Sequence, residues 1–162
     1  MRHRFFRIVP IVLLCFLLSG CGKQQESVND QNGDGKLTCT LEICCGTVLD
    51  HPDTLVNFPA LPADGVMLPE TEYEFTAGDS VYAVLEHAAQ EADLELRTKN
   101  SVGTTYILSI GGLSEFDFGG ASGWVYSVND DFPTVGCSSV TLQDGDAVRF
   151  LYTCDAGADV HE

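Results

Sequence analysis

Short stretches of the chain alternate apolar and polar residues, which is the period-two pattern of a β-strand with one buried face. The clearest alternations run through residues 39–45, 124–128 and 148–154. Shorter runs rich in apolar or β-branched residues predict further strands at residues 72–75, 94–97, 106–110 and 140–142. The sequence therefore predicts a chain whose regular structure is mostly β-strand.

One stretch follows helical spacing instead. Residues 78–80 (Gly-Asp-Ser) form a helix start, and apolar residues then recur three or four positions apart. These apolar residues are Val81, Val84, Leu85, Ala88 and Ala92. Residues 50–70 carry four prolines and predict an irregular connection. We therefore expect an α+β fold over residues 37–162, a mostly antiparallel β-sheet with one packed helix.

Two cysteines flank a predicted hairpin. A turn signal at residues 144–145 (Asp-Gly) separates the strands expected at 140–142 and 148–154. If these strands pair, Cys137 and Cys154 lie nearly opposite each other across the ladder, where a disulfide can form. We therefore predict a Cys137–Cys154 bridge, which in the chain-entropy model stabilises the fold by about 3 kcal/mol.

The first 20 residues have the layout of a secretory signal peptide. Arginines precede an apolar run over residues 8–18, which is too short to span a bilayer as a helix. The run leads into Leu-Ser-Gly-Cys, which resembles the bacterial lipobox and makes Cys21 the predicted lipidation site. An ordinary signal-peptide cleavage site is the alternative. We expect a signal peptide at 1–20, a flexible tether at 21–36, and an extracytoplasmic domain at 37–162 that the lipid holds to the membrane.

Charge narrows the classes of partner. The chain has 24 acidic residues and 8 Lys plus Arg, a formal net charge of −16. Without the first 20 residues, 5 basic residues remain against all 24 acidic ones, which gives −19 (5 − 24). Such a chain cannot neutralise phosphates, so a nucleic-acid partner is excluded. Membrane attachment through charge is excluded for the same reason, whereas attachment through a lipid is not. Seven cysteines favour an oxidising compartment.

A partial calcium-loop motif lies in the expected tether. Asp30, Asn32 and Asp34 match the D-x-N-x-D-G start of such a loop, and their oxygens suit a hard cation. Position twelve should be a bidentate acid and is Leu41, and no helical pattern flanks the motif. We therefore favour a solvated linker over a calcium site.

No residues form a recognisable catalytic set. No serine or cysteine has an evident base with an orienting partner, and no glycine-rich phosphate loop precedes a helix. Pairs of acids such as Glu115 and Asp117 are expected by chance in so acidic a chain. We therefore predict that the protein is not an enzyme and has no required cofactor.

The second half of the chain carries a more specific set of motifs. They are Ser-Gly-Trp-Val-Tyr-Ser-Val-Asn at 122–129, Phe-Pro at 132–133, Gly-Cys at 136–137, Asp-Gly-Asp at 144–146 and Tyr-Thr-Cys-Asp at 152–155. Together they resemble a bacterial family of unknown function that is similar to the C-terminal domain of transcobalamin and intrinsic factor. The resemblance covers about residues 37–161. The resemblance implies that residues 37–161 have the fold of that C-terminal domain. In transcobalamin-like proteins this domain closes over one face of a corrinoid.

The candidate ligand-binding residues are Trp124, Tyr126, Asn129 and Phe132. Aromatic rings that alternate on a strand and lead into a polar turn could form a flat stacking surface. Three of the four have a structural alternative, because Trp124 and Tyr126 at period two also suit a core and Asn129 suits a turn. Tyr106 is a further aromatic candidate, and it too could be a core residue.

Taken together, these features predict a cell-surface lipoprotein with a non-catalytic ligand-binding module. A corrinoid or a related small molecule is the ligand that the resemblance implies, and a surface or transporter protein is a partner for its uptake. The alternative is a surface adhesion or protein-interaction module with no small-molecule ligand.

Overall fold

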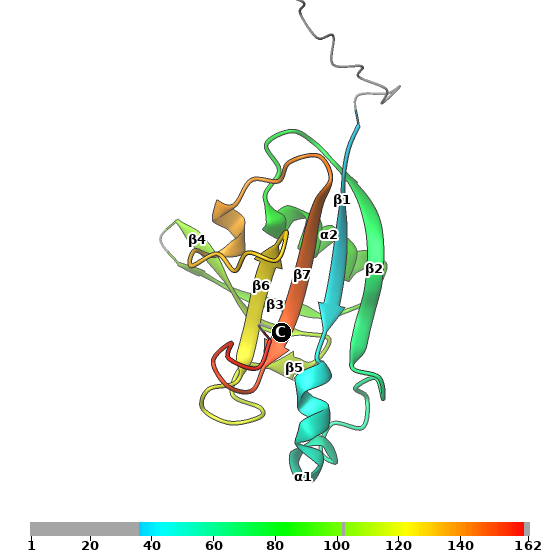
Figure 1. The fold of residues 1–162 in the computed structure, drawn as a ribbon, viewed down its shortest axis with the longest axis vertical. Coiled ribbons are helices and arrows are strands. Elements are labelled where there is room, and N and C mark those ends of the chain that lie inside the picture. Colours follow the sequence, from blue (N-terminus) through cyan, green and yellow to red (C-terminus); the bar gives the residue numbers. More distant parts are fainter. Residues whose placement is uncertain (1–35, 102, 161–162) are drawn as a thin grey trace, which may run out of the picture. The chain divides into compact units, whose positions relative to one another are not determined.

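Two β-sheets and one principal helix make up the fold in the computed structural model, which describes residues 36–101 and 103–160 (Figure 1). The strands are β1 (Leu37–Cys44), β2 (Val66–Phe75), β3 (Leu96–Ser101), β4 (Thr104–Ile110), β5 (Leu113–Ser114), β6 (Gly123–Val128) and β7 (Asp146–Thr153). The helices are α1 (Pro52–Leu55), α2 (Val81–Glu91) and two short 3-10 helices, η1 (Gly46–Asp50) and η2 (Cys137–Ser139). The predicted α+β class with one packed helix is confirmed.

The larger sheet has the strand order β2-β1-β7-β6. Strands β1 and β2 pair antiparallel, as do β6 and β7, whereas β1 and β7 pair parallel with Cys39 opposite Asp146. The first and last strands of the fold therefore lie side by side at the centre of the sheet. β6 and β2 are its two edges.

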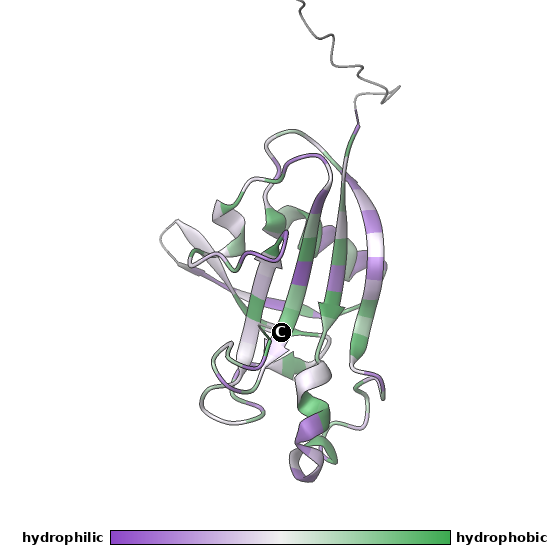
Figure 2. Cartoon of the chain, in the orientation of Figure 1, coloured by the Kyte–Doolittle hydropathy of each residue, from purple (hydrophilic) through white to green (hydrophobic). Residues whose placement is uncertain are grey.

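The smaller sheet, β3-β4-β5, and helix α2 cover the same face of the larger sheet. Figure 1 shows α2 and β3 behind the larger sheet. The main hydrophobic cluster fills the space between these layers and includes Leu41, Ile43, Leu85, Ile110 and Phe150. Figure 2 shows hydrophilic bands between hydrophobic ones along β2, β1 and β7, as expected for a sheet with one buried face.

Helix α2 begins where the sequence predicts. The side chain of Ser80 caps it, because its Oγ accepts a hydrogen bond from the Ala83 N–H at 3.3 Å. The buried positions of the helix are Val81, Val84, Leu85, Ala88 and Ala89. The helical spacing in the sequence therefore identifies the face that packs on the sheet.

Strand β2 is longer than predicted, because residues 66–71 belong to it and not to the irregular connection. Pro69 argued against a strand at this position in the sequence, because proline lacks the N–H that a central strand needs. Here the proline lies on an edge strand, where the pairing of β1 and β2 shifts register between Leu41 and Ile43. An edge strand with such an irregularity tolerates proline.

The predicted strand at residues 140–142 is wrong, and with it the hairpin that would have opposed Cys137 to Cys154. The segment forms only an isolated bridge, Ser80 to Thr141, and β7 pairs instead with β1 and β6. Cys137 lies in the main hydrophobic cluster, and Cys154 packs against a second cluster around Tyr152. Both thiols are free, so the predicted Cys137–Cys154 bridge is not formed in the structure.

Several predictions concern residues outside the described part of the chain. These are the signal peptide at 1–20, the lipidated Cys21 and the partial calcium motif of Asp30, Asn32 and Asp34. Within the described residues, no helix has the length and apolar character needed to cross a membrane. The same residues contain no group of three or more His, Cys, Asp or Glu side chains arranged to hold a metal ion.

Candidate functional site

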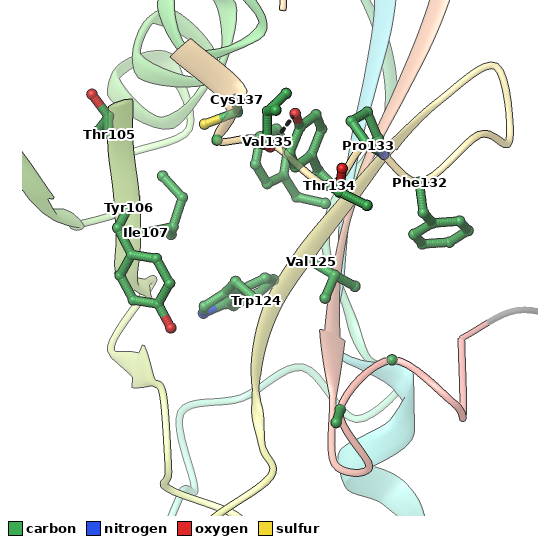
Figure 3. A pocket seen from close by; sticks show the side chains of 15 residues that line it. Thr105, Tyr106, Ile107, Trp124, Val125, Phe132, Pro133, Thr134, Val135 and Cys137 are labelled. Atoms are coloured by element: carbon green, nitrogen blue, oxygen red, sulfur yellow. Dashed lines mark hydrogen bonds between the residues drawn. The ribbon is translucent and has the colours of Figure 1, made fainter. Parts of the chain in front are cut away.

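A cavity of about 340 Å³ lies between the edge strand β6 and the strand β4 of the smaller sheet (Figure 3). Its walls include Tyr106 and Ile107 from β4, Trp124 and Tyr126 from β6, and Phe132 and Val135 from the loop that follows β6. Three of the four predicted binding residues, Trp124, Tyr126 and Phe132, therefore line one cavity. The volume is at the lower end of the range of about 300–1,000 Å³ that is usual for ligand pockets.

A hydrogen bond and an edge-on ring contact fix Trp124 in place. Its indole N–H donates to the carbonyl of Leu113 at 2.9 Å, and its ring meets the ring of Tyr152 edge-on with centroids 5.3 Å apart. The Tyr152 hydroxyl donates to the carbonyl of Ser114 at 2.7 Å. Trp124 is half-buried, so part of a rigidly held indole remains available at the cavity.

Tyr126 contributes more to the core than to an open surface. It is 9% exposed, and its ring stacks on Phe150 with centroids 5.7 Å apart. Its hydroxyl donates to the carbonyl of Val135 at 2.8 Å and so ties the loop at 132–137 to β6. Burial and the neighbouring Cys137 raise the pKa of Tyr126 to about 12, so the phenol stays neutral.

The aromatic side chains do not form one flat surface. In Figure 3, Trp124 and Tyr106 lie on one side of β6, whereas Val125 and Phe132 lie on the other. For Trp124 and Val125, which are neighbours on β6, this follows from the alternation of side chains along a strand. The cavity therefore extends around the free edge of β6.

Asn129 closes the turn after β6 and is absent from the cavity lining. Its φ is 53°, in the left-handed region that asparagine tolerates. Its side chain donates to Asp146 Oδ1 at 2.8 Å and accepts from the Ala147 N–H at 2.9 Å. Of the roles that the sequence left open, the structure places Asn129 in the turn, where it joins β6 to β7.

Tyr106 is the most exposed aromatic side chain of the lining, at 48%. Its hydroxyl donates to Glu115 Oε2 at 2.6 Å. This hydrogen bond and burial raise the pKa of Tyr106 to about 12. No sequence pattern predicts this pair, because the two residues meet only through the pairing of β4 with the segment after β5.

Two buried hydroxyl groups near these elements have no hydrogen-bond partner in the described part of the chain, Thr104 Oγ1 and Ser127 Oγ. Gly136 of the cavity lining lies against the first of them, because a Cβ built on Gly136 would be 1.7 Å from Thr104 Oγ1. Buried hydroxyls normally bond to protein, water or ligand. These two groups therefore leave hydrogen-bonding capacity beside β4 and β6.

Burial keeps the thiols in their neutral form. It raises the pKa of Cys39, Cys45 and Cys137 to about 11, and it is the main reason that the pKa of Cys44 rises to about 12. Burial also raises the pKa of Cys154. A nucleophilic cysteine needs its thiolate. Cys137, the cysteine that lines the cavity, is therefore held in its unreactive protonated form.

Comparison with known proteins gives a family match and a fold likeness. Residues 78–153 match a family described as a domain of unknown function, DUF4430. No curated protein matches the chain. A crystal structure of haptocorrin in complex with Cbi is similar at 12% identity and a TM-score of 0.55, over 73% of this chain and 25% of the haptocorrin chain. The predicted resemblance to the transcobalamin family is confirmed at the level of the fold.

A second solved structure is matched over nearly its whole length. It is a candidate metal binding protein from Ruminococcus gnavus ATCC 29149, with 15% identity over 74% of this chain and 97% of that one. The TM-score of this match is 0.42. The chain spans only about a quarter of haptocorrin, so the likeness to haptocorrin concerns one part of that larger protein.

Proposed function

We propose that residues 37–162 form a non-catalytic ligand-binding module and that the cavity between β4 and β6 is its binding site. The observation that carries the proposal is the cavity itself, which is preformed, about 340 Å³ in volume and walled by aromatic side chains. Such concave, mostly apolar sites with a few polar groups are typical of small-molecule binding.

The ligand we propose is a corrinoid or a related small molecule. The fold likeness to haptocorrin, whose structure contains Cbi, supports this class. A corrinoid macrocycle is larger than this cavity, so only its periphery could enter. The exposed part of Tyr106 and the half-buried Trp124 would then contact the part that enters.

We further propose that a lipid on Cys21 holds this module to the outer side of the membrane, where it passes ligand to a surface or transporter protein. The Leu-Ser-Gly-Cys sequence at residues 18–21 supports the anchor. A lipid anchor of this kind restricts the module to the membrane surface without requiring a favourable surface charge.

A titration tests the ligand class. The chain from residue 22 onward suits this experiment, because the described sheets and hydrophobic clusters lie wholly within residues 36–160. Trp124 is the single tryptophan, so its fluorescence reports on the cavity. We expect a saturable change on addition of cobinamide. The substitution Tyr106→Ala should weaken cobinamide binding by about tenfold, which corresponds to about 1.4 kcal/mol of binding free energy.

The matched control is Leu49→Ala, which shortens an exposed apolar side chain away from the cavity lining and should leave the affinity unchanged. If cobinamide gives no saturable change at tens of micromolar, direct corrinoid binding by this module is wrong. Equal loss of affinity in both variants would mean that the ligand binds elsewhere.

A further inference from the structure

The residues that line the cavity carry no ionised side chain. None of them is Asp, Glu, Lys, Arg or His, and the two tyrosines and the cysteine among them are neutral because their pKa values lie at about 11 to 12. A ligand with a net negative charge would therefore be desolvated there without a compensating cation. Burial of an unpaired charge is strongly unfavourable.

A carboxylate, that of Glu115, is hydrogen-bonded to the lining of this neutral cavity. Glu115 accepts the hydrogen bond from Tyr106, and its backbone N–H donates to the carbonyl of Leu108 on β4 at 2.9 Å. A Cβ built on Gly123 would be 3.7 Å from the Cβ of Glu115, which places Glu115 beside the residue that precedes Trp124. Glu115 therefore lies next to the ring of Tyr106 and close to the start of β6.

The charge of Glu115 has no basic partner in the part of the chain that the structure describes. The ion pairs there are Lys36 with Glu74, His87 with Glu91, and Arg149 with Glu42. A carboxylate offers about four acceptor sites, and the Tyr106 hydroxyl occupies one of them. Glu115 can thus accept further hydrogen bonds or hold a cation.

We propose that the part of the cavity beside Tyr106 is a subsite for a positively charged group of the ligand, held by the Glu115 carboxylate and the rings of Tyr106 and Trp124. The inference rests on the proposed role of the cavity and adds a charge class to it. Carboxylates attract ammonium groups directly, and the faces of tyrosine and tryptophan rings attract cations through their quadrupoles. The formal charge of −16 on the whole chain repels anions at longer range.

Three probes of similar size and different charge test this subsite on the chain from residue 22 onward. They are 2-phenylethylammonium, neutral 3-phenylpropanol and 3-phenylpropionate, each titrated while the Trp124 indole N–H is followed by NMR. We expect the cation to bind at least about tenfold more tightly than the anion at 10 mM salt, where the Debye length is about 30 Å. The preference should shrink at 0.5 M salt.

Two matched variants assign the preference to Glu115. Glu115→Gln should bring cation and anion affinities within about threefold of each other and keep the affinity for the neutral probe. Glu86→Gln is the control, since Glu86 accepts a hydrogen bond from the Tyr82 hydroxyl at 3.0 Å on α2, outside the cavity lining. It removes the same charge and the same kind of contact, and should leave the preference intact.

The possible results separate the two proposals. If no probe binds saturably, the cavity is not a binding site and both proposals are wrong. If the neutral probe binds but the anion binds as well as the cation, only the cation subsite is wrong. An unchanged preference in a folded Glu115→Gln also overturns it. Should that variant not fold, a preference that persists undiminished in 0.5 M salt would overturn the electrostatic account.

Discussion

At the scale of single residues, Phe116 stands out because it combines backbone strain with exposure. Its φ is 68°, in the region that bulky L-residues rarely adopt, and the side chain is 60% exposed. The loop holds this conformation, since the Phe116 N–H donates to the Ser122 carbonyl at 3.0 Å and the Ser114 N–H donates to Asp117 at 2.7 Å. Strained, exposed residues occur preferentially at functional sites. Phe116 directly follows Glu115, whose carboxylate is hydrogen-bonded to Tyr106 of the cavity lining.

Replacing Phe116→Gly should raise the free energy of unfolding by about 1 kcal/mol, because glycine adopts positive φ without the clash that Cβ causes. Urea denaturation monitored by Trp124 fluorescence measures this change. Val56→Gly is the control, because Val56 is 75% exposed and has a φ of −57°. It should lower stability, since glycine only adds entropy to the unfolded chain there. A less stable Phe116→Gly protein would contradict the strain assignment.

At the scale of elements, the loop at residues 132–137 closes one side of the cavity. The turn before it reverses the chain, with positive φ at Asn129 and Asp130, and the Tyr126 hydroxyl fixes the loop through Val135. Gly136 then passes against β4 so closely that no side chain fits. The loop position therefore depends on a tight contact between Gly136 and Thr104.

Gly136→Ala should displace the loop, because its Cβ would lie 1.7 Å from Thr104 Oγ1 and 3.0 Å from the carbonyl oxygen of Thr105. We expect a loss of about 1–3 kcal/mol in stability, as for other overpacked sites, and weaker ligand binding. Thermal unfolding and cobinamide titration measure both effects. Gly120→Ala is the matched control, because nothing lies within 4 Å of its added Cβ. Equal behaviour of the two variants would show that the loop does not depend on this contact.

The sequence predicted those elements whose pattern is local. Strands β1, β6 and β7 and helix α2 follow from alternation or helical spacing in their own residues. The partners of the strands do not, because the parallel pairing of β1 with β7 joins segments about a hundred positions apart. The segment 140–142 looked like a strand by composition, yet its backbone bonds to residues 79–81 at the start of α2.

The candidate site was predictable to a similar degree. The motif at 122–129 drew attention to Trp124 and Tyr126, and both line the cavity. The role of Tyr106 together with Glu115 depends on how β4 meets the segment after β5, which no single stretch of sequence reveals. Phe132 also lines the cavity, but on the other side of β6 from Trp124 (Figure 3).

At the scale of the whole molecule, buried thiols link stability to pH. Burial raises the pKa of Cys39, Cys45 and Cys137 from 9.0 in each case to about 11. The folded protein therefore binds these protons more tightly than the unfolded chain does. The resulting stability is fully present below pH 9.0 and is lost as the pH rises towards 11.

In the presence of reductant, the urea midpoint should therefore fall between pH 8.5 and pH 11. Cys137→Ala should show a smaller fall over the same range, because one of the contributing thiols is gone. Circular dichroism at several pH values measures the midpoints. A midpoint that stays constant or rises with pH would show that the thiols do not titrate in this way.

The lipid anchor is a prediction for the whole chain in its cell. In a bacterial host fed with radiolabelled palmitate, the wild-type protein should incorporate label and remain in the membrane fraction. Cys21→Ser should lose the label, because serine lacks the thiol that receives the lipid. Cys44→Ser serves as the control and should keep it. Label in the Cys21→Ser protein would contradict the assignment.

Ligand in the cavity between β4 and β6 should change the surroundings of the cavity walls. The most direct measurement is the change in backbone amide chemical shifts when cobinamide is added to the isotope-labelled chain from residue 22 onward. If ligand occupies the cavity, we expect saturable shifts at residues 105–107, 124–126, 132 and 134–137, which contribute the walls of the cavity. Shifts confined to other surfaces, or no shifts at saturating ligand, would contradict it.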